Sequence, residues 1–168
     1  MTWRTRRLPK ILTPGEGDAL TAALRTHRDR AMVAAMVLGG LRRCEVLGLR
    51  MEDLRVGERR VFIAEGKGGH QRLIPGSARF FVAVAAYLDA ERPPGLGTDA
   101  GFVVLKGPAR GEPLAGRGLD EILSGASDRA GLAHSPCHEL RHTRLTRRRA
   151  AGGSVEAARR RGGRGACP

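Results

Sequence analysis

The chain has 168 residues, of which 41% are hydrophobic, and this length and composition suit a single domain with a hydrophobic core. It has no run of the roughly 20 uncharged apolar residues that a membrane span needs, and its first residues, MTWRTRRLPK, lack the apolar run of a secretory signal. The formal net charge of +13 predicts a polyanionic partner, with nucleic acid the leading candidate, and we expect a cytoplasmic protein without a membrane partner.

Helical patterns come first along the chain. Thr13 followed by Pro14 is typical of a helix start, because threonine caps the helix and proline fits its first turn, and we expect this helix to run to about residue 26. A second helix is expected from near Asp29 to the Gly39-Gly40 pair, since its apolar residues recur at helical spacing. A third helix is expected at 43–49.

The hydrophobic period changes between Arg59 and Pro75, where apolar residues alternate with others around a glycine-rich turn. This pattern predicts a β-hairpin with Lys67 at its tip. Further along we expect a helix at 80–91, a third short strand at 102–105, a helix at 119–130 and another from His138 onward. The predicted fold class is α+β, mainly α, with a small three-stranded antiparallel sheet.

Three separated segments carry the residues suited to chemistry. They read GGLRRCEVLGLR at 39–50, GKGGHQRLIP at 66–75 and HELRHT at 138–143. In order and spacing they resemble the first arginine box, the hairpin lysine and the H-x-L-R-H box of the tyrosine recombinases, the phage-integrase family that includes Xer and λ-integrase-like proteins. The resemblance runs from about Leu12 to Val155, and it implies the catalytic fold of that family.

The resemblance also implies roles for individual residues. In this family a tyrosine attacks a DNA phosphodiester and forms a 3′-phosphotyrosyl link, so that negative charge on the phosphate oxygens must be stabilised. By resemblance, Arg42 and Arg141 bind these oxygens through their planar guanidinium groups. Lys67 matches the general acid that protonates the departing 5′-hydroxyl, and His138 matches the histidine that assists proton transfer. Glu45, one helical turn after Arg42, is expected to orient it.

The expected partner is double-stranded DNA, together with other recombinase subunits on that DNA. Arg42, Lys67, Arg72 and Arg141 are the predicted DNA-binding residues. The resemblance implies no metal and no cofactor, because two arginines would do the work that magnesium ions do in nucleases. The three cysteines are scattered and odd in number, which argues against a zinc ribbon and predicts free thiols.

The sequence departs from the family pattern near both ends. The only tyrosine is Tyr87, which lies among apolar residues in a predicted helix, so we expect it to be structural and the nucleophile to be missing. We expect a basic N-terminal segment at 1–11 and a catalytic domain at 12–155 that lacks its last helices. We also expect a degenerate Arg/Gly-rich tail at 156–168 and no N-terminal core-binding domain. The sequence therefore predicts a recombinase that is inactive alone.

Two other functions stay open at this stage. One is a non-catalytic DNA-binding or regulatory fragment that competes with an intact recombinase. The other is a zinc-dependent hydrolase, because His138-Glu139-x-x-His142 fits H-E-x-x-H, which on a helix binds zinc with the glutamate as general base. This pattern fixes only three positions and leaves Arg42 and Lys67 unexplained. It is therefore the weaker hypothesis.

Overall fold

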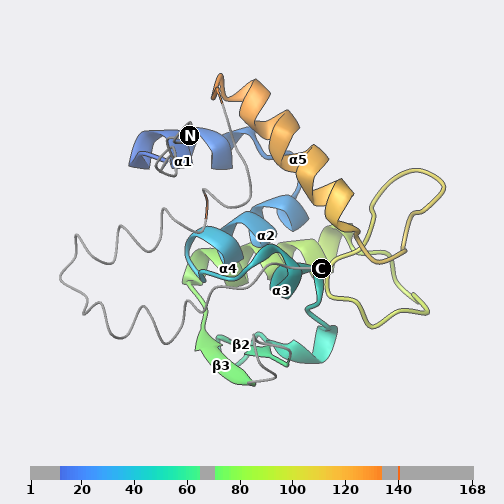
Figure 1. The fold of residues 1–168 in the computed structure, drawn as a ribbon. Helices are drawn as coiled ribbons and strands as arrows, with labels where there is room; N and C mark the ends of the chain where they lie inside the picture. The colour runs from blue at the N-terminus through green and yellow to red at the C-terminus, as the bar shows by residue number, and fades with distance from the viewer. Residues whose placement is uncertain (1–11, 65–70, 134–139, 141–168) are drawn as a thin grey trace, which may run out of the picture.

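The computed structural model describes residues 12–64, 71–133 and Leu140. In this part of the chain a group of helices lies on one side and a small sheet on the other (Figure 1). None of the described helices is both long and apolar enough to cross a membrane. The helices are α1 (Pro14–Ala23), α2 (His27–Val37), α3 (Arg43–Leu47), the 3-10 turn η1 (Met51–Asp53), α4 (Ala78–Ala86), the π-helical turn η2 (Tyr87–Glu91) and α5 (Gly116–Arg129).

The first two helices begin where side chains accept hydrogen bonds from their free N–H groups. Thr13 Oγ1 accepts from the backbone N–H of Glu16, and Glu16 Oε2 accepts from that of Thr13, so the expected cap of α1 is confirmed. In α2 the backbone N–H groups of His27 and Arg28 donate to the carboxylate of Glu91, at 2.8 and 3.0 Å. This distant carboxylate satisfies donors that would otherwise be unpaired. Helix α2 consequently begins two positions before Asp29.

The core lies around α2, which packs mainly against α4. Met32 and Met36 of α2 and Phe80 and Val84 of α4 are almost completely buried, as the helical spacing of apolar residues predicts. Leu140 is also fully buried in this core. Leu140, the one described residue of the third motif, therefore belongs to the same core as α2.

The sheet is antiparallel, with the strand order β1 (Leu54–Arg55), β2 (Arg60–Ile63) and β3 (Arg72–Pro75). The expected β2–β3 pairing is confirmed, with Val61 opposite Ile74. The third strand was wrongly predicted at 102–105, and it is β1 instead. A strand of two residues is too short to show an alternating pattern, whereas the apolar run at 102–105 is buried at Phe102 and Val103 and partly buried at Val104 and Leu105, without joining the sheet.

Two further predictions need correction. The expected helix at 80–91 is α-helical only to Ala86, and it then widens into η2, which closes with a hydrogen bond from Arg92 N–H to the carbonyl oxygen of Tyr87 at 2.8 Å. Cys44 in α3 is disulfide-bonded, so the expectation of free thiols is wrong for this residue. Spacing along a sequence does not show which groups meet in space.

Candidate functional site

A tight turn between α2 and α3 places Arg42 at the start of α3. Gly40 has a φ of +67°, a conformation that glycine adopts readily, and a Cβ at Gly39 would collide with the carbonyl oxygen of Ala35. Leu41, the next residue, is buried in the core. The glycine pair and the buried leucine therefore fix where the backbone of Arg42 lies.

Glu45 holds Arg42 through the backbone. Its Oε2 accepts a hydrogen bond from the backbone N–H of Arg42 at 2.8 Å, which caps α3 with a carboxylate. The Glu45 side chain is only 2% exposed. A buried carboxylate must be hydrogen-bonded or paired, because an unpaired one is costly. The prediction that Glu45 interacts with Arg42 thus has a structural counterpart, although the short contact is to the main chain.

The other oxygen of Glu45 is bound by an arginine from the sheet. Arg72 Nη2 donates to Glu45 Oε1 at 2.8 Å, whereas Arg42 Nη1 lies 3.7 Å from the same oxygen. The longer separation is an ion pair but exceeds hydrogen-bond range. Arg72 sits at the start of β3, opposite Ile63. It therefore connects the β-hairpin to the first turn of α3.

The Arg42 guanidinium remains poorly satisfied. Its side chain is 10% exposed, and its Nε is buried without a hydrogen-bond partner among the residues that the structure describes. Buried N–H groups are rarely left unpaired, and a ligand that binds at the guanidinium is one explanation for such a group; the Nε atoms of Arg43 and Arg92 are in the same state. The cluster of Arg42, Arg72 and Glu45 carries two positive charges and one negative charge. It is suited to an anion rather than a cation.

The structure brings together three of the predicted site residues: Arg42, Glu45 and Arg72. The predicted positions of Lys67, His138 and Arg141 lie outside the described residues. The short Glu45–Arg72 contact was not predicted, because the two residues are 27 positions apart and lie on different elements. The alternation of β3 offered the only signal, since it separates the sheet's two faces without naming the partner.

No group of three or more His, Cys, Asp or Glu side chains within 12–64, 71–133 and Leu140 is placed to hold a metal ion. The residues of the zinc hypothesis, His138, Glu139 and His142, fall outside these ranges. That hypothesis is therefore not tested by the described geometry.

Tyr87 lies in the core, as predicted. It is fully buried, its hydroxyl oxygen accepts a hydrogen bond from the backbone N–H of Val103 at 3.2 Å, and its ring lies 5.7 Å from that of Phe102. Burial raises the pKa of Tyr87 above its ordinary value. A nucleophilic tyrosine must reach a DNA phosphate, and this one is enclosed by its own domain.

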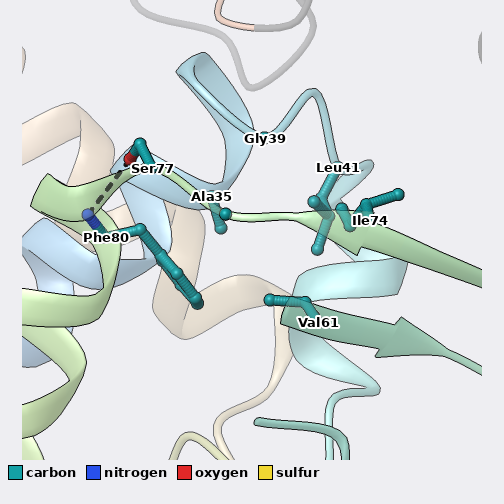
Figure 2. A pocket seen from close by; sticks show the side chains of 8 residues that line it. Ala35, Gly39, Leu41, Val61, Ile74, Ser77 and Phe80 are labelled. Carbon is teal, nitrogen blue, oxygen red and sulfur yellow. Dashed lines mark hydrogen bonds between the residues drawn. The ribbon is translucent and has the colours of Figure 1, made fainter. Parts of the chain in front are cut away.

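A small pocket lies between the end of α2, the hairpin and the start of α4. Figure 2 shows that its wall is formed by apolar side chains from these three elements, with Ser77 at one end capping α4 through the N–H of Phe80. Ala35, Leu41, Val61 and Ile74 contribute to the wall. With no charged residue among those that line it, this pocket offers nothing for phosphate chemistry, and the Arg42 cluster remains the candidate site.

The sequence profile of the phage integrase family matches residues 10–163. Tyrosine recombinase XerD of Mycobacterium tuberculosis (strain CDC 1551 / Oshkosh) is 36% identical over 157 residues, covering 84% of this chain and 49% of XerD. Tyrosine recombinase XerC of Pelobacter propionicus is 32% identical over 165 residues, covering 92% and 51%. The chain therefore belongs to the phage integrase family, that of the tyrosine recombinases, and it spans about half the length of these curated relatives.

Solved structures confirm the fold class. The XerA recombinase superposes with a TM-score of 0.80 at 22% identity, over 90% of this chain and 55% of XerA. The XerH site-specific recombinase bound to its difH substrate gives a TM-score of 0.76 at 20% identity, over 99% of this chain and 50% of XerH. The integrase of mycobacterium phage Brujita gives 0.73 at 25% identity, over 94% and 50%. The fold is that of a tyrosine-recombinase catalytic domain.

Proposed function

We propose that this chain binds double-stranded DNA and that Arg42 contacts a backbone phosphate there, in a domain whose family breaks and rejoins DNA by site-specific recombination. The observation that carries the proposal is the state of Arg42, which is held at a fixed helix start, nearly buried, and has an Nε without a hydrogen-bond partner among the described residues. A guanidinium offers five N–H donors in a planar fork that matches phosphate oxygens. A phosphate would bind through the terminal nitrogens of this fork, because Nε itself is enclosed by the protein.

The remaining roles follow from the motifs. We assign phosphate binding also to Arg141, protonation of the leaving 5′-hydroxyl to Lys67, and assistance of proton transfer to His138. Leu140, which lies between His138 and Arg141 in the sequence, is buried in the core that also contains α2. The catalytic domain would span 12–155, with basic or Arg/Gly-rich segments on either side. This chemistry requires no metal, since fixed cationic side chains stabilise the charge on the phosphate.

We further propose that this chain binds DNA without cleaving it. Its sequence contains one tyrosine, and Tyr87 is enclosed in the core with its hydroxyl hydrogen-bonded. The 3′-phosphotyrosyl step would then need a tyrosine from outside residues 1–168. This observation favours the second candidate function, a DNA-binding or regulatory fragment that competes with an intact recombinase for its sites.

The phosphate contact is tested by measuring the affinity of the full chain for a mixed-sequence DNA duplex over a range of salt concentrations. Arg42→Ala should weaken binding about tenfold or more, the effect of one charge-assisted hydrogen bond, and lower the salt slope by about one. The backbone contact between Arg42 and Glu45 survives this truncation, so the melting temperature should change little. An unchanged affinity and slope would overturn the proposal.

Arg117→Ala is the matched control. It removes the same charge from α5, where the side chain is 91% exposed and pairs with Glu121. Because an exposed charge is screened by salt, the control should change affinity by less than about twofold. Cleavage is tested separately, by incubating the chain with nicked duplexes on a denaturing gel. We expect no covalent adduct, and an adduct mapped to Tyr87 would refute the binding-only function.

A further inference from the structure

Glu45 lies between two arginines, and either of them could donate a hydrogen bond to its Oε1. Arg72 Nη2 lies 2.8 Å from this oxygen and Arg42 Nη1 lies 3.7 Å from it. The second carboxylate oxygen, Oε2, is already used by the backbone N–H of Arg42. Arg72 therefore supplies the short side-chain hydrogen bond to this buried acid, and the Arg42 guanidinium stands just beyond hydrogen-bond range.

Removing Arg72 would change which cation pairs with the carboxylate of Glu45. A carboxylate that is 2% exposed cannot turn to water for a donor, and leaving it unpaired is costly. The nearest cation would be the Arg42 guanidinium, which needs to move by only about 1 Å to form a charge-assisted hydrogen bond. Its donors would then be directed at Glu45 instead of at a ligand.

We propose that Arg72 is a positioning residue, which keeps the Arg42 guanidinium open to a DNA phosphate by occupying Glu45. This inference rests on the proposed function of Arg42. It differs from the direct DNA contact that the sequence suggested for Arg72. With Arg72 in place the cluster of two arginines and one glutamate has a net charge of +1, which one phosphodiester charge neutralises. Without Arg72 the cluster is neutral before DNA arrives.

The geometric part is tested without DNA, by determining the crystal structure of the full-length Arg72→Ala variant. The separation of Arg42 Nη and Glu45 Oε1 should shorten from 3.7 Å to the hydrogen-bond range of about 2.7–2.9 Å. A variant in which Arg42 keeps its place would overturn the inference. This result stands whether or not Arg42 contacts DNA, so it separates this failure from a failure of the proposed function.

The functional part is a suppressor experiment with the same mixed-sequence duplex. Arg72→Ala should weaken binding by about the same factor as Arg42→Ala, about tenfold. Adding Glu45→Gln should restore most of the affinity, because a neutral amide does not attract the guanidinium. If Arg72 touches DNA directly, or serves only the fold, the double variant stays as weak as Arg72→Ala, and the inference fails.

Two controls complete the design. Restoring net charge elsewhere, with Arg72→Ala combined with Glu121→Gln on α5, should not recover binding, since that carboxylate is exposed and pairs with Arg117 instead. Arg72→Lys keeps a cation for Glu45 and should stay within about threefold of the unmodified chain, which also covers the case that Arg72→Ala fails to fold. Recovery by Glu121→Gln, or a loss in Arg72→Lys as large as in Arg72→Ala, would contradict the positioning role.

Discussion

Replacing Tyr87 by phenylalanine tests whether the only tyrosine serves the fold. The substitution keeps the buried ring and its contact with Phe102 but removes the hydroxyl oxygen that accepts from the backbone N–H of Val103 at 3.2 Å. Val103 is itself fully buried, so water cannot replace this acceptor. An unsatisfied buried donor costs about 1–3 kcal/mol, and we expect Tyr87→Phe to lower the free energy of unfolding by that amount.

For a chain of this length each kcal/mol lowers the melting temperature by about 2–4 °C, so a fall of about 2–12 °C is expected in a thermal denaturation experiment followed by circular dichroism. Duplex affinity at 20 °C should be unchanged, because the fraction folded stays close to one. An unchanged melting temperature would refute the argument that the hydroxyl stabilises the fold by accepting a hydrogen bond from Val103. Loss of DNA affinity in a folded variant would instead indicate that Tyr87 faces the DNA.

Three further predictions concern pH, a helix cap and the third motif. Because burial raises the pKa of Tyr87, its neutral form is favoured in the folded state, so the contribution of Tyr87 to stability should be constant below about pH 10 and fall as pH rises further. Tyr87→Phe should reduce the alkaline loss of stability measured in denaturant titrations. Glu91→Ala should destabilise the chain by about 1–2 kcal/mol by freeing the N–H groups of α2, whereas Asp89→Ala, at an exposed position of the same turn, should have little effect. Arg141→Ala should weaken duplex binding while Glu139→Gln leaves it unchanged, and bound zinc in a metal analysis of the purified chain would revive the zinc hypothesis.

The local parts of the fold could be predicted from the sequence. The capping box of Thr13 and Glu16 needs only residues three positions apart, and the apolar alternation at Val61 and Ile63 identifies β2 directly. The two-residue strand β1 could not be predicted, because it carries no period. The start of α2 is stabilised by Thr26, whose hydroxyl accepts a hydrogen bond from the backbone N–H of Asp29, and by Glu91, more than 60 positions away. The local sequence does not show the Glu91 contact, and the start was predicted two residues late.

In the candidate site, too, local contacts could be predicted from the sequence and contacts between distant segments could not. Arg42 and Glu45 were predicted from one helical turn of sequence, and the structure places them together. The short contact of Glu45 with Arg72 joins two residues of opposite charge that come from different motifs. Only the folded backbone determines which arginine lies within hydrogen-bond distance of the carboxylate. The distances of 2.8 and 3.7 Å that distinguish the two arginines have no counterpart in the sequence.

The two edge strands of the sheet are poorly suited to pairing with a strand from another molecule. Its edge strand β1 has only two residues, with Arg55 exposed, and β3 ends in Pro75, which has no N–H to offer. Short, charged or proline-terminated edges are poor templates for a strand from another molecule. The described sheet should therefore resist self-association through edge pairing, even in concentrated solution.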